Sequence, residues 1–364
     1  MRVPSERFAA IDIGTVTCRM LVADVDEKGI CELDREYAIT NLGEGVDATG
    51  VLKPQAMERV ASAIDGYLHV LETFRTSEHS RIRIITMATS AARDAKNAEE
   101  FADLLAQRGV RLSVIPGARE AALSFLGASN DFVGESIVVV DIGGGSTEVV
   151  AGRAGQNPQR SHSFNIGCRR VTERFFSADP PTSEEMACAR AWIRKEMEPF
   201  FLSLRAGCKN DGAADGAADG VASGGAGSAN LRGKTNAAGA AGGKTSAAGD
   251  DVGSCVAPGR LVAVAGTATS VVSIHEHMET YDSARVHKTV VSRKALDAVC
   301  GRLSALPLAE RKRVVGLDPG RAPVIVAGLI ILQEICDLAG ANAFTVSESD
   351  ILHGIILDAA GGRL

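Results

Sequence analysis

The sequence Asp-Ile-Gly occurs twice in this chain, each time directly after an apolar run and just before a turn rich in hydroxyl groups. The first copy begins at Asp12 and the second at Asp141, 129 positions later, which is about the length of a small domain. A single copy is also typical of an ordinary strand that ends in a turn. Two copies at this spacing constrain the fold further, because they predict two related halves that each open with the same strand and turn.

The second copy continues into a loop of three glycines followed by Ser146, Thr147 and Glu148. Ordering three consecutive glycines is costly in entropy, so a ligand that approaches the backbone closely explains the run better than a plain hairpin does. Glycine-rich turns point N–H groups at an anion, and hydroxyl groups add further donors. We therefore expect the two loops to face each other across a cleft and to hold a phosphate chain from both sides.

A third loop follows the apolar run 261–265. It contains Gly266 and Thr267 and leads into a helical pattern from Val271. A strand, a small turn and a helix N-terminus form an anion site. Plain capping of the helix by Thr267 or Thr269 is the alternative, and this segment alone does not separate the two.

The remaining pattern predicts an α/β fold with mixed sheets flanked by helices. We expect an N-terminal domain over 1–126 and a C-terminal domain over 127–364. The predicted strands of the first half are 18–25, 30–39, 82–87 and 110–115, besides the one that ends at Asp12, and its helices are 54–74, 91–107 and 119–126. Those of the second half are strands ending at 141, then 148–151, 162–166, 261–265, 286–291 and 343–346, with helices 183–204, 293–303, 310–314, 323–339 and 350–360.

Residues 207–258 are almost wholly small and polar, and they contain no aromatic residue. Such a segment buries too little apolar surface to order itself, so it is predicted to be a disordered surface insertion. An interaction tail is the alternative. The two Gly-Lys-Thr sequences within it do not follow a strand and are not interpreted as phosphate loops.

Charge and cysteine content exclude several classes of protein. The net charge is −6 and the isoelectric point is about 5.7, so we expect neither a nucleic-acid partner nor a membrane surface. The eight cysteines include no Cys-x-x-Cys pair and are interpreted as reduced thiols of a cytoplasmic protein. The N-terminus has no apolar signal segment, and the longest apolar stretch, 324–332, is too short to span a bilayer.

Four carboxylates and one arginine are the candidates for chemistry. Asp12 and Asp141 end buried strands, where a carboxylate is costly unless a partner such as a metal ion binds it. Glu120 stands at a predicted helix start, where the helix dipole alone also favours an acid. Glu148 closes the triple-glycine loop. Arg93 lies in the run 88–97, and a solvated helix arginine is the alternative there.

Together these segments resemble the Ppx/GppA family of exopolyphosphatases and guanosine pentaphosphate phosphohydrolases. The resemblance implies two actin-like (ribonuclease H-like) domains with the active site in the cleft between them. It is closest to the short two-domain form, without the C-terminal HD-type extension of longer members. The matching segments are 10–15, 42–46, 88–97, 117–126, 140–148, 265–270, 311–320, 346–348 and 354–355.

The resemblance also implies roles for particular residues. Glu120 would be the general base that positions water, and Arg93 would neutralise the phosphate that is cut. Asp141 and Glu148 would bind Mg²⁺ or assist the water, with Asp12 as a further metal ligand. The phosphate-binding residues would be Gly14, Thr15, Thr17, Arg19, Gly143, Gly144, Gly145, Ser146, Thr147, Gly266 and Thr267.

The implied activity is hydrolysis of the terminal phosphate of inorganic polyphosphate. Hydrolysis of pppGpp to ppGpp is the nearest alternative, followed by a kinase or ATPase of the same superfamily and by a non-catalytic (p)ppGpp sensor. The family further implies a link to the stringent response, inhibition by (p)ppGpp and a homodimer. Val16 departs from the family, which carries a polar residue there, and this affects the expected grip of the first loop and its chain-length preference.

Overall fold

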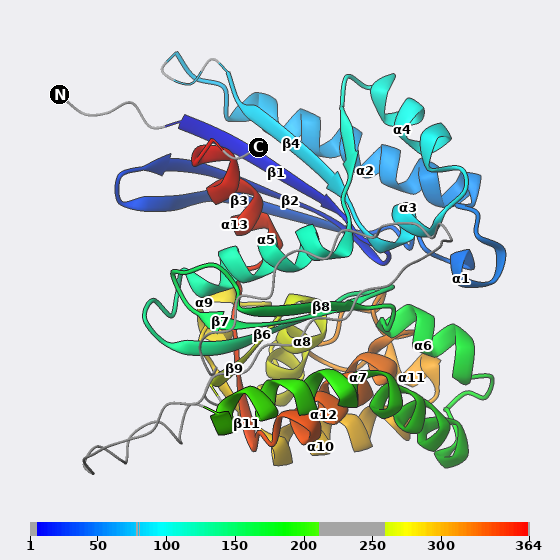
Figure 1. Cartoon of the computed structure of the whole chain (residues 1–364). Helices are drawn as coiled ribbons and strands as arrows, with labels where there is room; N and C mark the ends of the chain where they lie inside the picture. The colour runs from blue at the N-terminus through cyan, green and yellow to red at the C-terminus, as the bar shows by residue number, and fades with distance from the viewer. Residues whose placement is uncertain (1–5, 78, 80, 211–258, 363–364) are drawn as a thin grey trace, which may run out of the picture.

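The structure is a computed structural model that describes residues 6–77, 79, 81–210 and 259–362 (Figure 1). The predicted insertion at 207–258 lies outside these residues, except that the helix preceding it continues to residue 210. The described residues contain two mixed sheets, with the strand orders β3-β2-β1-β4-β5 and β10-β11-β9-β6-β7-β8. The first sheet comprises β1 (Glu6–Ile13), β2 (Thr17–Asp26), β3 (Gly29–Ile39), β4 (Arg83–Ala88) and β5 (Leu112–Val114), and the second comprises β6 (Ser136–Ile142), β7 (Thr147–Arg153), β8 (Arg160–Phe164), β9 (Arg260–Val264), β10 (Val290–Ser292) and β11 (Ala343–Val346).

The predicted duplication is visible in how the two sheets are built. β1 pairs antiparallel with β2 and parallel with β4, and β6 pairs antiparallel with β7 and parallel with β9. Both hairpins close in the same way: the N–H of Gly14 donates to the carbonyl of Thr17 at 2.8 Å, and that of Gly143 to the carbonyl of Ser146 at 3.0 Å. The predicted α/β class with two helix-flanked sheets is therefore confirmed.

Helices cover both sheets and fill the space between them (Figure 1). α2 and α4 contribute to the core on one face of the first sheet, while α7, α8, α10 and α12 contribute to the core on one face of the second. The helices are α1 (Val46–Thr49), α2 (Pro54–Thr73), α3 (Ser90–Asp94), α4 (Ala98–Ala106), α5 (Gly117–Ser129), α6 (Cys168–Phe175), α7 (Ser183–Asn210), α8 (Ala265–His275), α9 (Ser283–Val286), α10 (Arg293–Ser304), α11 (Leu308–Arg311), α12 (Ile325–Ala339) and α13 (Ile351–Ala360).

Helices α5 and α13 lie between the sheets and cross at two glycines. A Cβ atom on Gly127 would fall 1.9 Å from the carbonyl oxygen of Asp350, and one on Gly354 would fall 1.9 Å from that of Leu123. Through this crossing α13 shares a hydrophobic core with β1 and β2 of the first sheet. The division into 1–126 and 127–364 stays a prediction, and the last helix of the second part packs on the first sheet.

Some predicted elements differ from the structure for local reasons. The helix predicted over 91–107 is two helices, because Ala95 is extended and the Asn97 side chain bonds both backbone groups of Leu52. The strand predicted over 286–291 is reduced to β10, because Asp282 accepts two backbone hydrogen bonds and begins α9. Helix α6 was not predicted. In the described residues no helix is long and apolar enough to cross a membrane, and six cysteines are unpaired.

Candidate active site

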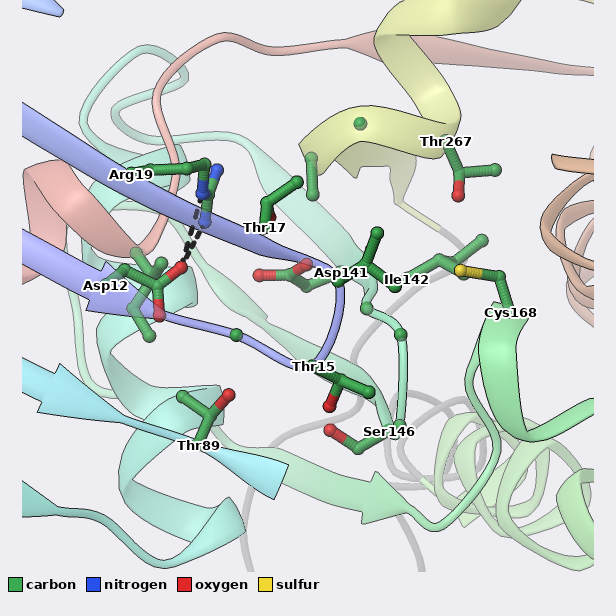
Figure 2. Close-up of a pocket in the computed structure, with 18 of the residues that line it drawn as sticks. Asp12, Thr15, Thr17, Arg19, Thr89, Asp141, Ile142, Ser146, Cys168 and Thr267 are labelled. Atoms are coloured by element: carbon green, nitrogen blue, oxygen red, sulfur yellow. Dashed lines mark hydrogen bonds and ion pairs between the residues drawn. The ribbon is translucent and has the colours of Figure 1, made fainter. Parts of the chain in front are cut away.

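A cavity of about 60 Å³ lies where the two hairpin loops meet the start of α8 (Figure 2). It brings together residues from both halves of the chain, and most of the predicted site residues line it. The lining residues are Asp12, Gly14, Thr15, Val16, Thr17, Arg19, Thr89, Glu120, Asp141, Ile142, Gly143, Gly144, Gly145, Ser146, Cys168, Ala265, Gly266, Thr267, Arg321 and Ile351.

Helix α6 orients the triple-glycine loop. The N–H of Cys168 donates to the carbonyl of Gly143 at 2.9 Å, and the N–H groups of Arg169 and Arg170 donate to that of Gly144 at 2.9 and 3.2 Å. In a planar trans peptide the C=O and the following N–H point in opposite directions. The N–H groups of Gly144 and Gly145 therefore point away from α6, and neither has an acceptor among the described residues. This is the geometry of an anion-binding loop.

Gly167 makes this arrangement sterically feasible. A Cβ atom there would fall 2.3 Å from the carbonyl carbon and oxygen of Gly144, which real side chains do not tolerate. Gly144 is crowded from the opposite side too, since its own Cβ would fall 2.6 Å from Val16 Cγ2. Val16 is 4% exposed and belongs to the hydrophobic core of the second sheet. The first loop thus replaces the expected polar donor with an apolar contact to the second loop.

Arg19 lies between two buried carboxylates. Its Nη2 is 2.6 Å from Asp12 Oδ2, and its Nη1 bonds Asp350, the N-cap residue of α13. Burial raises the pKa of Asp12, and the positive charge of Arg19 opposes that shift. The other oxygen of Asp12, Oδ1, is buried without a hydrogen-bond partner among the described residues. An acceptor in this position would gain from a donor or a cation, which no described residue supplies.

Glu120 lies in the first turn of α5 and is paired with Arg93. Arg93 Nη1 is 3.1 Å from Glu120 Oε2 and also donates to the carbonyl of Ile115 at 2.9 Å. Burial raises the pKa of Glu120 to about 8, although the charge of Arg93 acts in the opposite direction. A carboxylate with this pKa is a stronger base than an ordinary one and is partly ionised near neutral pH.

Asp141 and Glu148 form the acidic side of the site. Ser124 Oγ donates to Asp141 Oδ2 at 2.7 Å, and Ser163 Oγ donates to Glu148 Oε1 at 2.6 Å. Burial raises the pKa of Asp141 to about 6. Burial also raises the pKa of Glu148 well above its usual value, and the charges of Glu120 and Asp141 raise it further. Each of these carboxylates therefore gains from any positive charge that enters the cavity.

Three predicted site residues do not line the cavity themselves. Arg93 reaches the site through Glu120, and Glu148 stands on β7 directly opposite Asp141 of β6. Thr147 is fully buried, and its hydroxyl donates to the carbonyl of Ile166 at 2.5 Å. That hydroxyl is used within the fold, and the predicted phosphate contact from Thr147 has no support in its geometry.

Arg321 lines the cavity and was missed by the sequence reasoning. Its guanidinium lies so close to Gly266 that a Cβ atom on that glycine would fall 1.6 Å from Nη1. It has no hydrogen-bond or ion-pair partner in the described part of the chain. Burial, and then the charge of nearby Arg19, lowers the pKa of Arg321. A half-buried cation without a partner is suited to bind an anion. The available signal was the matching segment 311–320, which ends one residue earlier.

The carboxylates of the cavity are the candidate ligands for a metal ion. Among the described residues no group of three or more His, Cys, Asp or Glu side chains is arranged to hold one. The chemistry of the donors nevertheless fits Mg²⁺, since Asp12 Oδ1 is an unpartnered buried oxygen and Asp141 lies in the same cavity. Mg²⁺ commonly takes one or two carboxylates and completes its shell with water and substrate phosphates. The residues therefore fit an ion that arrives with its substrate.

Comparison with known proteins decides the family. The model of the Ppx/GppA phosphatase family matches residues 21–218 and 230–362. The chain belongs to this family. It is 36% identical over 371 residues to exopolyphosphatase 2 of Mycobacterium tuberculosis, covering 98% of this chain and 99% of that one. The predicted resemblance is thus confirmed.

Solved structures of this phosphatase family have the same fold. A crystal structure of an exopolyphosphatase-like protein is 30% identical, with a TM-score of 0.77 and 98% of each chain covered. The Aquifex aeolicus family member is 24% identical, with a TM-score of 0.71 and 99% of each chain covered, and it supports the fold alone. The actin-like arrangement expected from the sequence is therefore confirmed.

Proposed function

We propose that this Ppx/GppA phosphatase is an exopolyphosphatase that hydrolyses the terminal phosphate of inorganic polyphosphate and releases orthophosphate. One observation carries the proposal. Two backbone donors of the triple-glycine loop and the Arg321 guanidinium, none of which has a partner among the described residues, line one small cavity together with Glu120. Anion donors beside a base are what phosphoryl transfer to water requires. The full-length similarity to an exopolyphosphatase supports the choice of polyphosphate.

In this mechanism the residues position the phosphate and activate water. The N–H groups of Gly144 and Gly145 bind oxygens of the terminal phosphate, and Thr15 and Thr17 bind from the first loop, where the N–H of Gly14 is already used within the hairpin. Glu120 takes a proton from the attacking water, and Arg93 keeps its carboxylate oriented. Arg19 and Arg321 balance the charge of the phosphates that remain. Positioning and charge neutralisation supply most of the rate in such reactions.

The proposal includes Mg²⁺, which Asp12 and Asp141 would hold, with Glu148 standing opposite Asp141 in the hairpin. When bound, the ion would neutralise phosphate charge. Burial raises the pKa values of all three acids, so a cation among them would lower the cost of ionising them.

The deciding experiment measures orthophosphate release from long-chain polyphosphate and from pppGpp side by side, with and without Mg²⁺. Mg²⁺-dependent release from polyphosphate is expected. Release from pppGpp alone would assign the enzyme to guanosine pentaphosphate hydrolysis and the stringent response. No release from either would favour a (p)ppGpp sensor, and transfer of phosphate from a nucleotide to an acceptor would favour a kinase.

We further propose a cytoplasmic location, because the thiols of the described cysteines are unpaired. Inhibition by (p)ppGpp and a homodimer remain proposals that rest on the family. Binding of labelled ppGpp and sedimentation of the purified chain would test them.

A further inference from the structure

Arg170, in the first turn of α6, connects the triple-glycine loop to the first sheet's half of the molecule. Its Nε donates to the carbonyl of Gly145 at 3.0 Å. Its Nη2 bonds Asp94 at 2.6 Å, and its Nη1 bonds Asp47. The Arg170 side chain is 16% exposed, while the side chains of Asp47 and Asp94 are each 33% exposed. A guanidinium that bonds three groups at once is held in one geometry more firmly than a single surface ion pair.

The bond to Gly145 bears on phosphate binding. Because the peptide between residues 145 and 146 is planar, turning its carbonyl toward Arg170 turns the N–H of Ser146 in the opposite direction. That N–H has no acceptor among the described residues, and Ser146 lines the cavity. Arg170 therefore fixes the direction of a third donor, after those of Gly144 and Gly145.

The bond to Asp94 bears on the base. Asp94 is the last residue of α3, and its neighbour Arg93 holds Glu120. One side chain thus connects Gly145 to the segment that orients the general base. The two parts are also in close contact, since a Cβ atom on Gly145 would fall 2.5 Å from Ser90 Oγ. A shift of Arg170 would change the spacing between the phosphate donors and the base.

We propose that Arg170 is a positioning residue that sets the distance between the triple-glycine loop and the Arg93–Glu120 pair. This inference rests on the proposed function. Arg170 does not line the cavity, so it acts through Gly145 and Asp94 and not on the substrate. A misplacement of about 1 Å can cost on the order of 100-fold in rate. We therefore expect loss of Arg170 to lower kcat much more than it raises KM.

The test compares Arg170→Gln, Arg170→Lys and Asp94→Asn on polyphosphate. We expect kcat to fall about 10- to 100-fold in Arg170→Gln, with KM changed less than about threefold. Arg170→Lys keeps the positive charge but loses the planar guanidinium. Its kcat is expected to lie between those of the wild type and Arg170→Gln. The control is Arg174→Gln on the same helix, since Arg174 lies over Trp192 away from the cavity. Its kcat should be unchanged.

A double-mutant cycle separates positioning from general destabilisation. Adding Asp94→Asn to Arg170→Gln should lower kcat no further, because both changes break the same connection. Additive losses, or a kcat within twofold of wild type in a folded Arg170→Gln, would overturn the proposal. If Arg170→Gln does not fold, Asp94→Asn alone tests the proposal, which then requires a lower kcat with a nearly unchanged KM in that variant. An inactive wild-type protein would instead reject the proposed function.

Discussion

Asp141 and Glu148 lie directly opposite each other across the β6–β7 hairpin, at the positions that Asp12 and Arg19 occupy across β1–β2. The duplicated hairpin therefore carries an ion pair in one sheet and two acids in the other. Burial raises the pKa values of both acids, and the negative charges of Glu120 and Asp141 raise that of Glu148 further. The second hairpin is the side of the site that gains from added positive charge.

This pairing makes stability depend on pH. The pKa of Glu148 is raised in the folded protein, so its protonated form favours folding at low pH and this contribution is lost as pH rises above its usual value of 4.5. Glu148→Gln should raise Tm by several degrees at pH 8 in EDTA and much less at pH 5. Thermal unfolding at both pH values checks this. Glu198→Gln, at an exposed position on α7, is the control. A Tm gain of Glu148→Gln that does not grow with pH would contradict a raised pKa of Glu148.

The assignment of Glu120 as the base predicts a loss of turnover without a loss of binding. Glu120→Gln should lower kcat by roughly 10²- to 10⁴-fold while polyphosphate binding, measured by calorimetry, stays close to wild type. In the wild type, kcat/KM should rise with pH toward about 8, because only the ionised carboxylate accepts a proton. Near-normal turnover in this variant would remove the assignment. Glu99→Gln, exposed on α4, is the matched control.

Replacing Arg321 is predicted to increase thermal stability and to weaken polyphosphate binding. Arg321→Met removes a half-buried charge that has no partner among the described residues, so the ligand-free protein should become more stable by a few degrees in Tm. The same variant should raise KM for polyphosphate about tenfold or more, because a charged hydrogen bond to phosphate is lost. Added polyphosphate should raise the Tm of the wild type more than that of the variant. A variant that is less stable and binds normally would show that Arg321 is structural.

Gly167 tests the contact between α6 and the triple-glycine loop. Gly167→Ala places a methyl group 2.3 Å from the Gly144 carbonyl, so the loop or the helix must move. We expect a destabilisation of about 2 kcal/mol or more, with at least tenfold lower activity. Gly66→Ala in α2 is the control, since its Cβ would meet nothing within 4 Å. It should stabilise the helix by about 0.5–1 kcal/mol, and equal behaviour of the two variants would refute the argument.

Local pattern was sufficient to predict the repeated hairpins and the parts of the site they carry. The two Asp-Ile-Gly copies predicted both loops, because strand ends and glycine turns depend on neighbouring residues. Asp12, Glu120 and Asp141 were predicted and line one cavity. Helix α6 was missed because its N-cap residue, Gly167, has no side chain that could cap the helix. The N–H groups of its first turn donate instead to carbonyls of the triple-glycine loop, which lies far away in the sequence.

The sequence by itself therefore determined the α/β class, the duplication, the family and the chemical types of the candidate groups. Tertiary structure decided which of those groups meet. It placed Thr147 away from the cavity, Arg321 beside Gly266, and Val16 against the triple-glycine loop. It also returned α13 to the first sheet, so that Asp350 reaches Arg19. These relations join residues far apart in the chain, and local propensity carries no information about them because each depends on packing of the whole fold.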